Sequence, residues 1–294
     1  MPLNNIFAAF NKHSFMKKIV VSAFALFSGT FLFAQKFTDK VVLANGEKIN
    51  IETSLSTEAA VMGMEMTNTT SSKNKLEVKV ATEQNYTVSS TTTHVKTDMN
   101  MMGQSMSYDS DKPESGNADV AKAMGEKINK PVDLLLDAKT SDAVLVTKKD
   151  KKSGDDEGLP MDGLLSMAGD NSEEGLVSGA FELIPQGKKI GDTWMDSTIT
   201  KDSKTVRTFT LKSVDGNMAT IGLNATVSAT TKMEMQEMEI EMKSNTVTTG
   251  EIITDITTGK VKKKTSTSEI SGTMQLMGQD MPVTAKLVTT NIYN

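Results

Sequence analysis

Three short stretches of the chain share the pattern Met-Gly-x-x-Met, and a fourth stretch lacks only the glycine. The three begin at Met62, Met102 and Met277, and the fourth is Met235–Met238. Strand-like segments flank these stretches. A glycine between two such segments is typical of a tight β-hairpin turn, because glycine adopts a positive φ without strain. The sequence therefore predicts a fold organised around four hairpin tips.

The second tip predicts strands with two different faces. With Gly103 and Gln104 as the turn residues, Met101 is expected opposite Met106. Cross-strand partners share a face of a sheet, and successive pairs alternate between the faces. One face is then apolar, whereas the other carries serine, asparagine and aspartate. The apolar face of this tip consists of Met99, Met101, Met106 and Tyr108.

The last two tips give the same two-faced pattern. With the glycine again placed first in the turn, Leu276 is expected opposite Met281. In the tip without glycine, the polar face brings Glu234 opposite Glu239, which is unfavourable unless water reaches both carboxylates. The apolar face of the whole set is the surface that we expect to face a ligand. Its members are Met99, Met101, Met106, Tyr108, Met233, Met274, Leu276 and Met281.

The first 34 residues are typical of a secretion signal. Met16, Lys17 and Lys18 form a basic start, an apolar run follows at 19–33, and Ala34 precedes the expected cleavage point. The apolar run is shorter than the roughly 20 residues of a membrane-spanning helix. We therefore expect a protein exported to the periplasm or the extracellular space. The alternative to cleavage is that the segment stays as a membrane anchor. A separate open point is whether Met1 or Met16 is the true first residue.

The mature chain is expected to be acidic. Loss of residues 1–34 removes three lysines and moves the formal charge from −5 to −8. A local basic cluster, formed by Lys260 and Lys262–Lys264, is interpreted as a solvated strand end. An acidic domain from a chain with only 5% aromatic residues overall is poorly suited to nucleic acid, so no nucleic-acid partner is expected.

The mature chain, 35–294, is predicted to form a single β-rich domain. A β half at 36–113 and a second at 191–294 each hold two of the tips, and a mostly helical insert at 114–190 separates them. The tips lie 40 residues apart in the first half, from Gly63 to Gly103, and 42 in the second, so the halves read as an internal repeat. In the insert we expect helices at 118–127, at 161–168 and from an N-cap at Asn171 to Ile184, and strands at 132–137 and 143–147.

The expected fold class is mainly β (α+β), with a curved antiparallel sheet or half-barrel and a short helical insert. Two-faced strands need a cover for their apolar face. Either the two halves cover each other as a sandwich, or the insert fills the concave face of one curved sheet, which we favour. The insert residues suited to this are Leu164, Leu165, Met167, Leu176, Val177, Phe181 and Ile184.

A second motif supports a resemblance. The sequence Pro185, Lys188 and Gly191-Asp192-Thr193-Trp194, together with the Met-Gly tips, resembles a family of secreted, β-rich bacterial proteins of unknown function. The resemblance covers most of 36–294 and implies fold and export, but no activity. In architecture, the layout is similar to the half-barrels with helical inserts of periplasmic lipoprotein carriers, although a shared fold does not establish function.

The residues offer little for catalysis or metal binding. The chain has no cysteine, which excludes disulfides, zinc–thiolate sites, thiol nucleophiles and a lipobox anchor. After signal cleavage His94 is the remaining histidine, and strand parity puts it with Lys96 and Asp98 on the polar face, as a solvated side chain. No catalytic motif surrounds it. We therefore predict a protein that is not an enzyme and has no catalytic residues, no cofactor and no metal site.

Three functions remain open. The first is a binder of an apolar small molecule or lipid on the methionine face. The second is a structural or envelope-protein interaction module in which that face is fully buried. The third is a Cu(I) site, because Met99, Met101, Met102 and Met106 offer soft thioether ligands. Leu276, Val283 and Ile240 occupy equivalent positions at other tips and cannot ligate a metal, which favours packing over copper.

Overall fold

The structure is a computed structural model, and the part of the chain that it describes forms one compact unit within Lys36–Asn294. The described residues are 36–61, 63–101, 103–115, 121, 125, 128–146, 172–235, 238–276 and 279–294. The expected secretion signal and the helix expected at 161–168 lie outside these residues. Most of the helix expected at 118–127 does as well.

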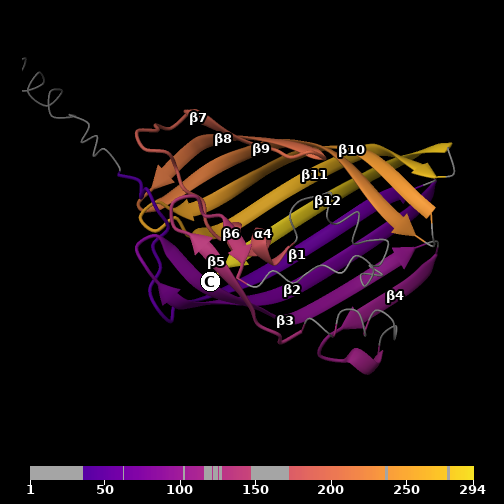
Figure 1. Cartoon of the computed structure of the whole chain (residues 1–294), viewed down its shortest axis with the longest axis horizontal. Coiled ribbons are helices and arrows are strands. Elements are labelled where there is room, and N and C mark those ends of the chain that lie inside the picture. The colour runs from indigo at the N-terminus through magenta and orange to yellow at the C-terminus, as the bar shows by residue number, and fades with distance from the viewer. Residues whose placement is uncertain are drawn as a thin grey trace, which may run out of the picture. The chain divides into compact units, whose positions relative to one another are not determined.

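In the described part of the chain, twelve antiparallel strands form one open sheet, which confirms the predicted fold class (Figure 1). The strand order is β6-β5-β3-β2-β1-β12-β11-β10-β9-β8-β7. Strand β4 also pairs with β3, along a later part of β3 than the part that pairs with β5. The strands are β1 (Lys48–Val61), β2 (Met64–Ala81), β3 (Asn85–Met101), β4 (Gln104–Asp109), β5 (Val132–Asp137), β6 (Ala143–Leu145), β7 (Thr193–Ile199), β8 (Ser203–Asp215), β9 (Met218–Met235), β10 (Met238–Asp255), β11 (Val261–Leu276) and β12 (Gln279–Tyr293).

The first and last long strands join the two parts of the chain into one sheet. β1 pairs with β12 from Ile51 opposite Tyr293 to Val61 opposite Val283. Figure 1 shows the sheet curving, with β8 and β9 on one side, β3 and β4 on the other, and β12 and β1 between them. The sheet is therefore a single curved layer, and the two halves do not form a sandwich.

The hairpin tips occur where they were predicted, but the turn is one residue earlier. Met101 pairs with Gln104, so Gly103 is the second turn residue, and its φ of 78° is the left-handed value expected of glycine. Leu276 likewise pairs with Gln279 at the last tip. Our placement of glycine first in these turns was wrong. The faces survive because every partner moves by two positions, and side chains alternate with a period of two.

The tip without glycine has the predicted register. Met235 pairs with Met238, and Glu239 with Glu234. The register was predicted correctly here because this turn has no glycine, so no position in the turn had to be assigned to one. The strands around all four tips therefore present the expected face toward the inside of the curve.

Two glycines on the inner face allow the sheet to curve. A Cβ at Gly250 would lie 2.4 Å from the Thr265 carbonyl oxygen, and a Cβ at Gly272 would lie 2.4 Å from that of Lys243. Such distances are too short for any side chain, so β10 and β11 approach each other more closely here than other residues allow. Glycine inside a strand commonly marks this kind of bend.

The insert contributes a short helix, α4 (Glu173–Ser178), and the strands β5 and β6. Ser172 caps α4, since its hydroxyl accepts a hydrogen bond from the Gly175 N–H at 3.1 Å. The helix was predicted from an N-cap at Asn171 to Ile184, which is wrong in both its cap and its length. It ends early because the chain then pairs with the start of β11, where the Val261 N–H donates to the Ala180 carbonyl at 2.9 Å.

The main core lies where α4 and the segment after it pack on the concave face. Val177, Phe181 and Ile184 are buried there against strands from both halves of the chain. Phe181 and Ile184 are not part of a helix as expected, because they follow α4. The insert nevertheless covers this end of the sheet, as predicted. Strand β5 coincides with the expected 132–137, and β6 lies within the expected 143–147. Leu164, Leu165 and Met167 lie outside the described residues.

Candidate functional site

The concave face is divided into three zones along its long strands. Near α4 lies the main core, which includes Ile51 of β1 and Tyr293 of β12. Toward the tips lies a second apolar cluster, which we call the methionine end. Its buried members are Ala59, Met242, Ile270, Val283, Ala285 and Leu287, with Leu55, Met66, Met99 and Met274 packed against them. Between these clusters, strands β1, β2, β3, β10, β11 and β12 all carry threonine, serine or asparagine at inward positions.

The predicted ligand-facing residues all share the concave face. The strand pairing of Met99 with Met106 and of Thr97 with Tyr108 places them there together. Tyr108 is buried, and the other described side chains are half-buried; these are Met99, Met101, Met106, Met274 and Met281. Met233 and Leu276 have backbone positions on the same face, but their side chains lie outside the described set. The sequence thus predicted which residues gather, whereas contact with a ligand stays a prediction.

Some members of the polar band between the clusters are hydrogen-bonded to one another or to neighbouring inward residues. Thr97 donates its hydroxyl hydrogen to Asn68 Oδ1 at 2.8 Å, and Thr92 donates to Asn74 Oδ1 at 2.7 Å. We define the polar band by its members Thr53, Thr57, Asn68, Asn74, Thr97, Thr246, Ser268 and Asn291. The sequence did not reveal this band, because threonine, serine and asparagine are also typical of the solvated face of a strand.

Within the described residues, three buried atoms of the polar band have no hydrogen-bond partner. They are Thr53 Oγ1, Thr57 Oγ1 and Asn291 Oδ1, and Thr57 is 1% exposed. Thr53 and Asn291 are direct cross-strand neighbours on β1 and β12. An unsatisfied buried polar atom costs about 1–3 kcal/mol. Such atoms gathered on one concave wall indicate a place where a polar group of another molecule can bind.

A charged group borders the polar band beside α4. Lys264 of β11 is the cross-strand neighbour of Asn291, and Glu182, which follows α4, interacts with it electrostatically. Burial raises the pKa of Glu182 to about 7, and the positive charges of Lys264 and Arg207 oppose this rise. Burial likewise lowers the pKa of Lys264. Arg207 forms an ion pair with Asp196 at 3.0 Å on the edge strands.

Glu182→Gln is expected to stabilise the protein at pH 8 and to have little effect at pH 4. The pKa of Glu182 is higher in the folded state, at about 7, than its ordinary value of 4.5. As the pH rises through this window, the unfolded chain loses the proton first, so the stability of the wild type falls and the loss is complete above pH 7. The expected difference at pH 8 is on the order of 2 kcal/mol.

Urea unfolding of wild type and Glu182→Gln at both pH values measures this difference. Every other titrating group is common to the two proteins, so subtraction isolates the effect of Glu182. Equal stabilities of the two proteins at pH 8 would show that Glu182 is not desolvated in the folded state.

The lysines of the basic cluster at β11 do not all point into solvent, because neighbouring residues of a strand face opposite sides of the sheet. Lys263 is exposed on the convex face, whereas Lys264 points to the concave face. Lys260 forms an ion pair with Glu47. The interpretation of this cluster as a solvated strand end holds for Lys262 and Lys263 and was wrong for Lys264. Alternation along β11 could have revealed the inward lysine, once the apolar face of β11 had been assigned.

His94 lies on the convex face, as strand parity predicted, and it meets two carboxylates. Its Nε2 atom lies 3.3 Å from Asp109 Oδ1 and 3.5 Å from Asp111 Oδ2. The Asp111 N–H and, secondarily, His94 lower the pKa of Asp109. Within the described residues this group could hold a metal ion. Hydrogen bonding between the imidazole and the Asp109 carboxylate accounts for this arrangement, so we assign no metal to it.

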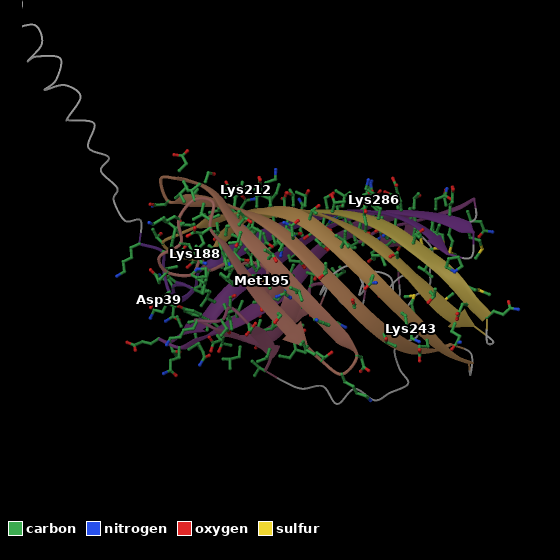
Figure 2. All side chains as sticks on the ribbon, turned by 90° about the horizontal axis from the view of Figure 1, so that it is seen from above. Asp39, Lys188, Met195, Lys212, Lys243 and Lys286 are labelled. Carbon is green, nitrogen blue, oxygen red and sulfur yellow. The ribbon has the colours of Figure 1, made fainter. Side chains whose placement is uncertain are left out.

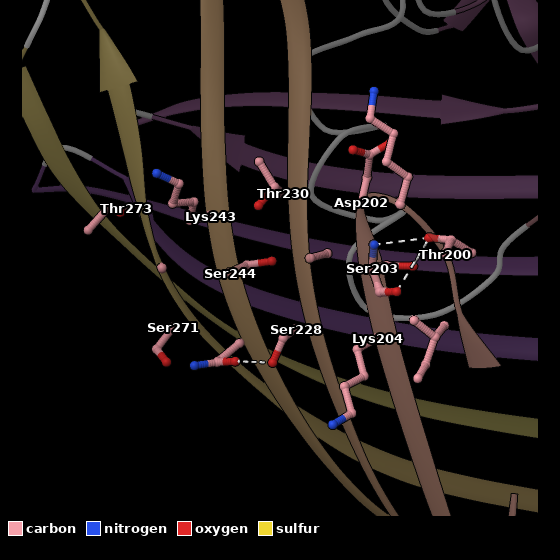
Figure 3. A pocket seen from close by; sticks show the side chains of 15 residues that line it. Thr200, Asp202, Ser203, Lys204, Ser228, Thr230, Lys243, Ser244, Ser271 and Thr273 are labelled. Atoms are coloured by element: carbon pink, nitrogen blue, oxygen red, sulfur yellow. Dashed lines mark hydrogen bonds between the residues drawn. The ribbon is translucent and has the colours of Figure 1, made fainter. Parts of the chain in front are cut away.

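Lysines and small polar side chains cover the convex face, where Figure 2 labels Lys212, Lys243 and Lys286. An open groove of about 690 Å³ crosses β9, β10 and β11 on this side (Figure 3). Across the groove, Ser228 donates to Asn245 Oδ1 at 2.6 Å. Hydroxyls and lysines that water solvates make this surface less suited to a ligand than the concave face, where buried polar atoms lack partners.

Comparison with known proteins gives a family without an assigned activity. Residues 83–261 match a family of unknown function (DUF6263). The matched segment contains the second tip and the motif from Pro185 to Trp194. No curated protein matches the chain. Within the described residues, none of the helices is long and apolar enough to cross a membrane.

Proposed function

The chain belongs to the family of unknown function DUF6263, and we propose that it is an exported, non-enzymatic binding protein for an amphipathic, lipid-like molecule. The molecule is held on the concave face of the sheet, with its apolar part at the methionine end. The observation that carries this proposal is the combination, on one wall, of half-buried methionines and buried polar atoms without partners. Export rests on the basic and apolar character of residues 1–34.

The methionine end supports an apolar partner. Met66, Met99 and Met274 are only partly buried, although they pack against fully buried aliphatic residues. Unbranched thioether side chains adapt to ligands of different shape, and methionine is common on surfaces that bind apolar partners. A cluster of partly exposed apolar side chains on a concave surface is a typical feature of small-molecule sites.

The polar band argues against a purely structural role for the concave face. A face that served only as core would gain nothing from Thr53, Thr57 and Asn291, whose buried polar atoms lack partners. An amphipathic ligand could supply both the apolar cover and the missing hydrogen bonds. The alternative, an interaction module with this face fully buried, predicts that no small molecule binds.

Binding of an environment-sensitive apolar dye and of long-chain fatty acid tests the proposal. Met274→Glu puts a charge at the methionine end, and the matched control Val247→Glu puts one on the convex face, where Val247 is 52% exposed. We expect Met274→Glu to weaken binding at least ten-fold and Val247→Glu to leave it unchanged. Circular dichroism shows whether both variants fold.

Two results would overturn this function. One is a wild-type protein that binds neither the dye nor the fatty acid. The other is equal binding by wild type, Met274→Glu and Val247→Glu. Mass spectrometry of material extracted from protein purified from its native compartment then identifies the bound molecule, if the dye and fatty acid do bind.

A further inference from the structure

We propose that the ligand carries a headgroup with an anionic oxygen and a neighbouring hydroxyl, held by Lys264, Thr53 and Asn291. This inference rests on the proposed function, because it assigns one end of the same concave site. It names the chemical class of the ligand as an anionic, hydroxylated amphiphile. The tail would then run from this row of residues toward the methionine end.

The three residues form one row across three strands. Thr53 of β1 is paired with Asn291 of β12, and Asn291 is paired with Lys264 of β11. Directly opposed side chains in a sheet lie about 4.5–5.5 Å apart at their Cβ atoms, so a single headgroup can reach all three. The row lies next to the main core, because Ile51 and Tyr293, two positions away on the same face, are both buried.

Lys264 supplies the positive charge. Its side chain is half-buried. Among the described residues, no carboxylate lies within 4.0 Å of its ammonium group. Its electrostatic partner, Glu182, has a pKa of about 7, so part of Glu182 is uncharged at neutral pH. A desolvated cation without a direct partner is costly, and an anionic oxygen bound to it would offset that cost.

The two neighbours of Lys264 complete the recognition pattern. Thr53 Oγ1 and Asn291 Oδ1 are both buried, and among the described residues neither has a hydrogen-bond partner. A hydroxyl such as that of Thr53 can donate to an anionic oxygen, whereas a carboxamide oxygen requires a donor. The ligand therefore needs an acceptor beside a donor. A 2-hydroxy carboxylate and a hydroxylated phosphate ester share this chemistry.

The strand direction gives the tail a path. Along β12 the inward residues change from Asn291 through Thr289 to Leu287 and Ala285, which belong to the methionine end. The six positions from Asn291 to Ala285 span about 20 Å at roughly 3.3 Å per residue. A long alkyl chain anchored at Lys264 would therefore lie on Leu287, Ala285 and the methionines beyond them.

The test compares two ligands that share a tail and a 2-hydroxyl and differ at the first carbon, which is a carboxylate in one and a neutral hydroxymethyl group in the other. 2-Hydroxyhexadecanoate is the anionic probe, and hexadecane-1,2-diol is its neutral counterpart with the same tail and hydroxyl. Binding is measured at pH 7 by displacement of the apolar dye from the mature chain. We expect the acid to bind at least ten-fold more tightly than the diol. 2-Hydroxyhexadecyl phosphate is a third probe. Whichever of the two anions binds more tightly shows whether the site is built for a phosphate or for a carboxylate.

Lysine variants locate the charge. Lys264→Met is expected to remove the preference for the acid over the diol. The matched control is Lys263→Met, one residue away on the opposite face, which should keep the full preference. Thr53→Val preserves the shape of the side chain and removes the hydroxyl. It should weaken binding of the acid about five-fold, which provides a second test if Lys264→Met fails to fold.

The outcomes separate this inference from the proposed function. Equal binding of acid and diol by the wild type overturns the anionic headgroup but leaves a lipid-binding protein. A preference for the acid that persists in a folded Lys264→Met protein, or that Lys263→Met removes instead, overturns the assignment to Lys264. Failure of acid, phosphate and diol alike to displace the dye, or absence of dye binding, overturns the proposed function and the headgroup with it.

Discussion

Replacing Phe181 by alanine is expected to lower the free energy of unfolding by about 3–5 kcal/mol. The ring of Phe181 is 3% exposed and belongs to the main core, together with residues of both β halves. Its backbone also forms a bridge with Lys260, the residue just before β11. Removing the ring leaves a cavity at the point where the insert is attached to the sheet, and a close-packed interior refills such a space only in part.

Urea denaturation, followed by circular dichroism, measures the effect of Phe181→Ala. Ile190→Ala is the matched control, because Ile190 lies in the same connecting segment and is 63% exposed. Its loss should change stability by less than about 0.5 kcal/mol. Equal midpoints for the two variants would mean that the insert is not part of the core. A changed affinity for dye in a fully stable Phe181→Ala protein would instead identify the insert as a lid over the ligand.

The predicted tips and faces were correct because they depend on local rules. Alternation with a period of two placed Met99, Met106 and Tyr108 on one face, and this result survives an error of one residue in the turn. The exact turn was missed because glycine suits either position of a two-residue hairpin turn, depending on the turn type. Gly103 occupies the second position, a choice that the sequence alone leaves open.

Errors in the insert arose where long-range contacts decide the structure. The acidic residues after Asn171 do begin a helix, but its end depends on pairing between the segment after Gly179 and β11. That partner is about eighty residues away in the chain, so no local signal reveals it. The sequence around Ile184 is apolar in either conformation, which made an extended segment look like the end of a helix.

The candidate site was predicted only in its apolar half. Methionines on strands were recognisable, whereas the polar band was not, because threonine and asparagine at inward positions have the same pattern as a solvated face. Thr57 and Asn68 are buried cross-strand partners on the concave face. The inward position of Lys264 was overlooked for a related reason. In a run of neighbouring lysines, nothing in the run itself indicates that Lys264 faces the concave side while Lys263 is exposed. Buried polar residues are visible only when the partner strands are known.

Gly272→Ala is expected to destabilise the protein by about 3 kcal/mol, because the added methyl group has no space. A Cβ at this position would lie 2.4 Å from the Lys243 carbonyl oxygen and 3.1 Å from the Ser244 Cα atom. Both are backbone atoms of β10, so relief requires the two strands to separate. Their separation would flatten the sheet beside the methionine end and expose part of the concave face.

Gly222→Ala is the matched control for Gly272→Ala, and the comparison isolates the close approach of two strands from the general effect of glycine. A Cβ at Gly222 would meet only the flexible end of the Lys212 side chain, which can move aside. Because alanine restricts the unfolded chain more than glycine does, Gly222→Ala should be neutral or stabilising by up to about 1 kcal/mol. Urea unfolding midpoints of the two variants and of the wild type measure the difference. If Gly272→Ala unfolds at the same urea concentration as Gly222→Ala, β10 and β11 do not need their close approach, and the curvature of the sheet must arise from its twist alone.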